Sequence, residues 1–202
     1  MAKTIGILTS TDTRGRFSAV GHIRLIEFQM KNDAIVLVGM AGVGKSSIGK
    51  LLAESLGFDF VDLDEYIFKK DGRTVRMIVD EDGDEALLQL EKTRMFEINL
   101  SRVVVAPGGS IIYHAGLMKY LQGQSVVVHL DDSFENIEAR LQSPADRGIV
   151  GLKTKALRQI YNERRPLYSR YAYTTIDCSN KSKHQVVDEI RQLFDRVRET
   201  EQ

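Results

Sequence analysis

The chain has 202 residues, enough for one domain with a substantial hydrophobic core. Its 28 Lys and Arg balance its 28 Asp and Glu, and a pI near 6.9 gives no electrostatic case for a nucleic-acid or acidic-membrane partner. No stretch is apolar enough to span a membrane or to act as a signal peptide, and the single cysteine, Cys178, excludes an intrachain disulfide and a cysteine metal cluster. We therefore expect a soluble, cytoplasmic protein with a monomer as the default state.

Residues 1–32 precede the first clear strand. Thr4–Thr9 has the composition of a short strand, and His22–Phe28 alternates weakly. This pattern fits a β-hairpin at a sheet edge, a partner-binding arm, or an extension upstream of a start near Met30. We expect the extension, followed by one domain over residues 33–202.

A phosphate-binding motif follows that first strand. The apolar run Ala34–Val38 predicts a buried parallel strand, and the sequence GMAGVGKS directly after it is a complete GxxxxGK[ST] P-loop. Its glycines allow backbone N–H groups to surround phosphate oxygens, while Lys45 reaches the β- and γ-phosphates and the Ser46 hydroxyl can ligate Mg²⁺. The predicted nucleotide-binding residues are Gly42, Val43, Gly44, Lys45, Ser46 and Ser47.

After the P-loop, strand-like apolar runs alternate with helical patterns. The expected strands are Phe58–Leu63, Val103–Ala106, Ser125–Leu130 and Thr174–Asp177. The expected helices are Ser47–Leu56, Glu65–Lys70, Thr74–Val79, Asp84–Leu100, Gly116–Leu121, Ser133–Gln142, Thr154–Glu163 and Lys183–Thr200, with a polar loop at 142–152. This alternation predicts an α/β protein with a five-stranded parallel sheet and helices on both faces.

Two carboxylates lie at the end of the second strand. Asp62 and Asp64 are two residues apart, so both can project the same way from an extended segment. One can hold Mg²⁺ through water, and the other can accept a hydrogen bond from a substrate hydroxyl and aid its deprotonation. Because ligands bind at the carboxyl ends of parallel strands, we expect this pair, the P-loop and the Gly108-Gly109 turn to share one cleft.

These motifs, in this order and spacing, resemble the shikimate kinase family of small P-loop kinases. The likeness runs from about Ala34 to the C-terminus and is carried by GMAGVGKSSIGKLLAESLG, FVDLDEYI, DGDEALLQLE, APGGS, ADRG and NERRPLY. It implies a P-loop NTPase fold of the nucleoside-monophosphate-kinase type with a lid loop. It also implies an ATP- and Mg²⁺-dependent kinase that transfers the γ-phosphate to a hydroxyl of shikimate or a related hydroxy acid.

The resemblance implies roles for the acidic and glycine positions. Asp62 would assist Mg²⁺, and Asp64 would contact the acceptor hydroxyl as a base or orienting group. Gly108 and Gly109 would let backbone amides approach the acceptor closely.

Three arginines also match the family pattern. Arg147, in the lid loop, would stabilise the transferring phosphate, and Arg140 would stack on adenine. Arg164 would bind the acceptor carboxylate, ideally through a bidentate pair, with Arg165 as the adjacent alternative.

The chain departs from the family pattern at three positions. The family carries a second carboxylate-binding arginine where this chain has Leu88, which is thus a predicted substrate-binding position, and Glu91 is retained one helical turn on without that partner. Ser110 replaces the third glycine of a Gly-Gly-Gly turn, where its side chain can crowd or hydrogen-bond the acceptor. Gly148 replaces the proline after Arg147, which predicts a more flexible lid.

Because this arginine is missing, the identity of the phosphate acceptor stays undetermined. One lost charge-assisted hydrogen bond of roughly 1.5–3 kcal/mol predicts about ten- to a hundredfold weaker shikimate binding. The chain is then a weak shikimate kinase, a kinase of another small metabolite such as a sugar acid, or a non-catalytic nucleotide-binding relative. Alternatively, Leu88 packs in the core and Arg94 or Arg73 supplies the cation.

Overall fold

The computed structural model describes residues 33–141 and 148–200. Its strands are β1 (Ala34–Val38), β2 (Asp59–Asp62), β3 (Val103–Ala106), β4 (Val126–Asp131) and β5 (Thr174–Asp177). Its helices are α1 (Lys45–Leu56), α2 (Leu63–Asp71), α3 (Val75–Glu81), α4 (Asp84–Phe96), the 3₁₀ turn η1 (Ile111–Tyr113), α5 (Ala115–Gln122), α6 (Phe134–Arg140), α7 (Leu157–Tyr171) and α8 (Lys183–Thr200). The segment 1–32, with its predicted extension, and Arg147 lie outside the described residues.

The five strands form one parallel sheet in the order β2-β3-β1-β4-β5. β1 lies at the centre, where Val36 pairs in register with Val105 of β3 and Val127 of β4. All five residues of β1 are buried, as a continuous apolar run requires when both faces of a strand are covered. The predicted five-stranded parallel sheet is confirmed.

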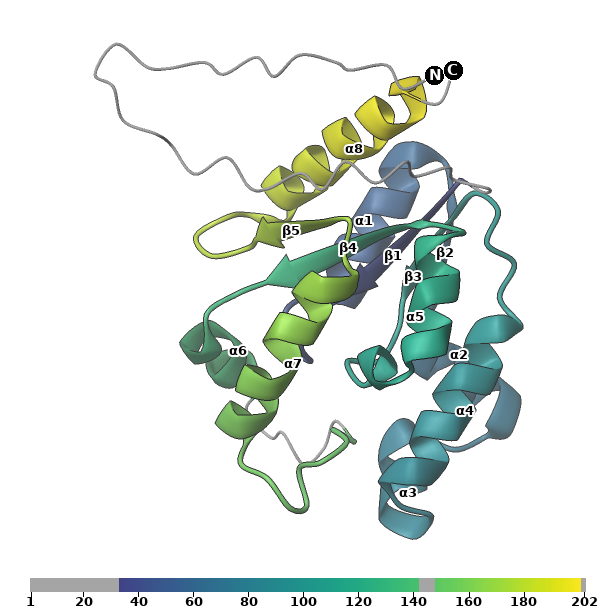
Figure 1. Cartoon of the computed structure of the whole chain (residues 1–202), viewed down its shortest axis with the longest axis vertical. Coiled ribbons are helices and arrows are strands. Elements are labelled where there is room, and N and C mark those ends of the chain that lie inside the picture. The colour runs from purple at the N-terminus through teal and green to yellow at the C-terminus, as the bar shows by residue number, and fades with distance from the viewer. Residues whose placement is uncertain (1–32, 142–147, 201–202) are drawn as a thin grey trace, which may run out of the picture.

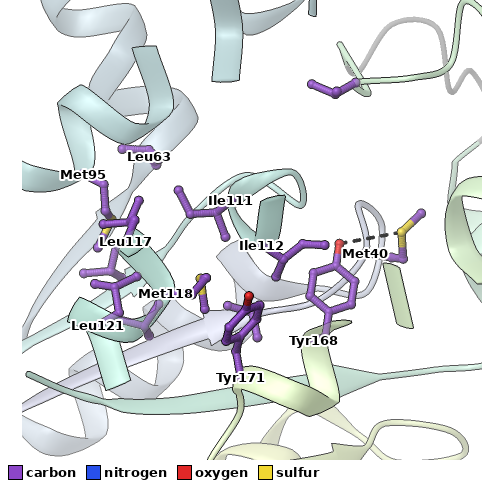
Figure 2. Packing of buried hydrophobic residues seen from close by; sticks show 14 of the residues in the cluster. Met40, Leu63, Met95, Ile111, Ile112, Leu117, Met118, Leu121, Tyr168 and Tyr171 are labelled. Atoms are coloured by element: carbon purple, nitrogen blue, oxygen red, sulfur yellow. Dashed lines mark hydrogen bonds between the residues drawn. The ribbon is translucent and has the colours of Figure 1, made fainter. Parts of the chain in front are cut away.

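Helices cover both faces of this sheet (Figure 1). Side chains alternate along β1, so that Ile35 and Leu37 pack with α1 and α8 while Val36 packs in the layer that contains α2 to α7. Figure 2 shows part of the second layer, where Met95 lies near Leu117 and the other apolar side chains of α5. The predicted coverage of both faces is also confirmed.

Two helices end well away from the expected residue. α4 ends at Phe96 rather than Leu100, because Ile98 and Leu100 enter the core from the segment that leads into β3. α7 begins at Leu157 and continues through Pro166 to Tyr171, where the prediction stopped at Glu163. Its buried residues Ile160, Tyr161, Tyr168 and Tyr171 anchor it along its length, so tertiary packing outweighs the proline.

Among the described residues, no helix combines the length and the hydrophobicity that a membrane span requires.

Candidate active site

The carboxyl ends of the central strands open into one cavity of about 560 Å³. The P-loop residues 42–48, the Asp62/Asp64 pair and the turn 107–110 after β3 all line it. These segments are adjacent because parallel strands end at the same edge of a sheet. The structure therefore brings together the groups that the sequence predicted to share a cleft.

The P-loop leads directly into α1, whose N-terminus faces this cavity. Gly44 is the N-cap residue, with φ of +107°, a conformation that glycine adopts without strain. In the described part of the chain, α1 has no side-chain cap and no acidic residue in its first turn. Its first N–H groups and its positive dipole end are thus available to an anionic ligand.

Lys45 places a cation in the same space. Its Nζ donates hydrogen bonds to the carbonyl oxygens of Gly39 at 2.9 Å and Met40 at 3.1 Å. Burial lowers the pKa of Lys45 from 10.5 to about 8, although the nearby carboxylates of Asp64 and Asp62 oppose this shift. A bound phosphate would favour the charged amine, so the site suits a polyanionic ligand.

Asp62 joins the P-loop to the start of α2. Its Oδ2 accepts a hydrogen bond from Ser46 Oγ at 2.5 Å, while its Oδ1 caps α2 by accepting from the N–H groups of Asp64 and Glu65. This cap corrects one expectation: Asp64 lies in the first turn of a helix, not in an extended segment with Asp62. Both still line the cavity.

The oxygens of Ser46 and Asp62 fit a magnesium site. Among the described residues, no three His, Cys, Asp or Glu side chains converge on a possible metal position. Mg²⁺ is commonly held by one or two protein oxygens, with water and substrate phosphates completing its shell. Two adjacent protein oxygens beside a phosphate-binding loop match that pattern.

Arg164 is the arginine that α7 contributes to the cavity. It is 1% exposed, and its Nε and Nη2 donate to Tyr113 Oη at 3.2 Å and the Val150 carbonyl at 2.7 Å. Its Nη1 faces Gly109, where a β-carbon would lie 3.3 Å from it. Arg165, the predicted alternative, instead forms a bidentate ion pair with Asp131 and is not among the cavity-lining residues.

Glu91 is a cavity residue to which the sequence assigned no role. It is 1% exposed, and Ser110 Oγ donates a hydrogen bond to its Oε2 at 2.6 Å. Its Oε1 lies where a β-carbon on Gly108 would come within 1.9 Å, so any side chain at residue 108 would require the Glu91 carboxyl group to move. Burial raises the pKa of Glu91 from 4.5 to about 7, against the opposing effect of the Ser110 hydrogen bond.

On the other side of β1, the cavity is lined by Arg140 of α6 and by the segment after β5. Arg140 Nη1 donates to Asp132 Oδ2 at 2.7 Å and lies 3.5 Å from the Gly42 carbonyl. The Asp132 side chain is fully buried and also accepts hydrogen bonds from Asn136 and Ser179. It thus connects α6 to the loop after β5.

That loop was not predicted as part of the site. Cys178, Lys181, Ser182 and Lys183 line the cavity. Their position after the carboxyl end of a parallel strand is the signal that points to them.

Gly148 brings the described end of the lid loop against α3. Its φ is +57°, and a β-carbon would lie 2.8 Å from the Arg76 backbone nitrogen. A proline cannot adopt this φ, so glycine here permits a close backbone approach, which the expectation of a more flexible loop did not include. Ile149 and Val150, the next two residues, are buried and line the cavity.

Comparisons with known proteins agree with this geometry. A family model described as shikimate kinase matches residues 41–195, and the shikimate kinase of Persephonella marina is 35% identical over 158 residues, covering 77% of this chain and 95% of that protein. The chain belongs to the shikimate kinase family. It is an ATP-dependent phosphotransferase that acts on a small molecule.

Two further matches extend over nearly the whole length of shikimate kinases. The Sulfurihydrogenibium enzyme is 35% identical over 162 residues, covering 80% of this chain and 96% of that protein. The structure of the Acinetobacter baumannii enzyme in complex with shikimate matches with a TM-score of 0.74 at 30% identity, covering 81% of this chain and 93% of that chain. The alternatives of another metabolite or a non-catalytic protein are not favoured.

Within this shikimate kinase fold, Leu88 lies outside the cavity lining. Leu87 and Glu91, four residues apart on one face of α4, line it, whereas Leu88 is not among the lining residues and packs, half-buried, against the apolar core. The predicted contact between Leu88 and the acceptor stays a prediction, since this structure places Leu88 outside the cavity lining. The two cations offered as substitutes are also engaged elsewhere, Arg94 with Asp71 and Glu97, and Arg73 with Glu81 and Asp82.

Proposed function

We propose that this phosphotransferase is a shikimate kinase that transfers the γ-phosphate of ATP in line to a hydroxyl of shikimate. The observation that carries the proposal is that one cavity contains the P-loop cation Lys45, the carboxylate Asp64 and the buried cation Arg164. Under this proposal, Lys45 belongs to the phosphate donor site, Arg164 binds the carboxylate of the acceptor, and Asp64 acts as the base. This activity would belong to aromatic amino acid biosynthesis.

The donor site would be built by the P-loop. Backbone N–H groups of residues 42–47 and the N-terminus of α1 would hold the phosphates, and Lys45 would turn from the loop carbonyls to the γ-phosphate. Ser46 and Asp62 would hold Mg²⁺, which neutralises phosphate charge when bound. Arg140 would lie against adenine, because it borders the P-loop at Gly42 and lines the cavity.

The acceptor site would be built by α7 and the turn after β3. Arg164 would bind the shikimate carboxylate, since two of its nitrogens are fixed by protein oxygens and Nη1 faces the Gly109 turn. The backbone at Gly108 and Gly109 would approach the ring. These contacts would hold one hydroxyl beside Asp64.

In the transfer step, the acceptor hydroxyl oxygen forms a bond to the γ-phosphorus as the bond to the β–γ bridging oxygen breaks. Asp64 accepts the hydroxyl proton, and ADP leaves. Arg147, by its position in the family pattern, would stabilise the charge on the transferring phosphate.

A coupled assay of ADP release with ATP, Mg²⁺ and shikimate tests this proposal. Lys45→Met should abolish turnover, while Asp64→Asn should retain ATP binding and lose transfer. A screen of other hydroxy acids and sugar acids serves as the specificity control. Absence of shikimate-dependent ADP release by the wild-type enzyme would refute the proposed function.

We further propose that the enzyme is cytoplasmic, in keeping with its single cysteine, and monomeric, because the sequence has no obvious apolar surface stripe. Size-exclusion chromatography with light scattering tests the oligomeric state, and a mass of twice 22.8 kDa would contradict it.

A further inference from the structure

A buried carboxyl group faces the acceptor half of the cavity and is held on both sides. Glu91 projects from α4 toward the turn 107–110, where Ser110 Oγ donates to its Oε2 at 2.6 Å. Its Oε1 lies against Gly108. Few rotamers of Glu91 are compatible with both contacts, so the carboxyl group has a defined position.

Ser110 is placed to make this contact and little else. It is 4% exposed, it directly precedes η1, and its hydroxyl points to Glu91 rather than into open cavity. A buried carboxylate that loses its donor is strongly disfavoured. Arg164 and Lys45 also stabilise the charge of Glu91, but through space.

The two departures in the acceptor half are therefore structurally connected. The family pattern has an arginine at the position of Leu88, one helical turn from Glu91, and a glycine at the position of Ser110. This chain lacks that cation and has a hydroxyl donor on the same carboxyl group instead.

We infer that Ser110 is a positioning residue for acceptor recognition, which acts by holding Glu91 against Gly108. Glu91 then presents its carboxyl edge to a hydroxyl of the acceptor, and the acceptor's anionic group is left to Arg164. Ser110 and Glu91 together would select a polyhydroxylated acceptor with one carboxylate directed at Arg164. This inference rests on the proposed function.

Ser110→Ala tests the inference because it removes the hydroxyl and keeps the β-carbon. The acceptor KM should rise roughly ten- to a hundredfold while the ATP KM stays unchanged, since the P-loop is untouched. Ser125→Ala is the matched control: Ser125 is also fully buried, but its hydroxyl donates to the Leu121 carbonyl away from the cavity. It should leave both KM values at the wild-type level.

A second substitution separates positioning from a general loss of structure. Leu88→Arg places a cation one helical turn from Glu91, so it should lower the acceptor KM of Ser110→Ala by at least fivefold and that of the wild-type enzyme much less. If Ser110→Ala does not fold, Ser110→Gly takes its place in the same double-mutant comparison with Leu88→Arg, because glycine restores the family turn.

The outcomes distinguish this inference from the proposed function. A wild-type enzyme without shikimate-dependent turnover refutes the function itself. An active wild-type enzyme whose acceptor KM is unaffected by loss of the Ser110 hydroxyl refutes the positioning role. Equal effects of Leu88→Arg with and without Ser110 also refute it.

Discussion

Glu91→Gln tests the electrostatics of the acceptor half through the pH dependence of folding stability. Burial raises the pKa of Glu91 to about 7 in the folded protein, from an ordinary value of 4.5. Since the folded state holds this proton more tightly than the unfolded chain does, the stabilising contribution is full below about pH 4.5. It is lost as the pH rises through about 7. Glutamine has nearly the same shape and does not titrate.

The pKa difference fixes the expected size of the effect. The difference between 4.5 and about 7 corresponds to about 3 kcal/mol in full, most of which is lost between pH 5 and pH 8. His129 contributes in the opposite direction, because burial lowers its pKa from 6.5 to about 4. Its contribution is full above about pH 6.5 and is lost as the pH falls toward 4. The pH dependence of wild-type stability alone therefore underestimates the contribution of Glu91. The difference in the free energy of unfolding between the wild-type protein and Glu91→Gln isolates that contribution.

Urea unfolding at pH 5, 6.5 and 8 gives the free energy of unfolding for both proteins. Relative to Glu91→Gln, the wild-type protein should lose about 2 to 3 kcal/mol across this range. Equal m-values would show that the denatured states are comparable. A stability difference that is the same at all three pH values would refute the reasoning, because Glu91 would then titrate as it does in the unfolded chain.

Three further predictions address the rest of the cavity. The pKa of Lys45 is about 8, so ATP affinity measured by calorimetry should fall about tenfold per pH unit above 8 and stay level below 7; a level profile to pH 9.5 would contradict its role. Gly148→Ala should cost at least about 2 kcal/mol of stability and lower kcat, because its β-carbon would meet the α3 backbone. Gly151→Ala, with φ of +87° but room for a methyl group, should cost only about 1 kcal/mol, and equal costs would refute the steric argument. Asp132→Asn should raise the ATP KM about tenfold and leave the acceptor KM unchanged, because it removes the buried carboxylate that holds the cavity arginine of α6. Asp131→Asn, which breaks a neighbouring pair outside the cavity, is its control.

Local chemistry explains why much of the fold and donor site could be predicted. The apolar run of β1 indicates a strand buried on both faces. The residue spacing of the P-loop corresponds to a defined backbone conformation. The carboxyl-end rule then placed Asp62, Asp64 and the Gly108-Gly109 turn in one cleft, which the structure contains. The continuation of α7 through Pro166 was not predicted, because the packing that overcomes the local cost of the proline comes from distant residues.

Residues close together in the chain are enough to predict the family, the five-stranded architecture and the phosphate-binding half of the cavity. The acceptor half instead depends on tertiary packing. This packing directs Arg164 inward and Arg165 outward, and it leaves Leu88 outside the cavity lining. It also brings Ser110 to Glu91 across 19 residues of sequence. The direction of a side chain on a helix, and the partner it meets, depend on how helices dock on the sheet, which no local pattern specifies.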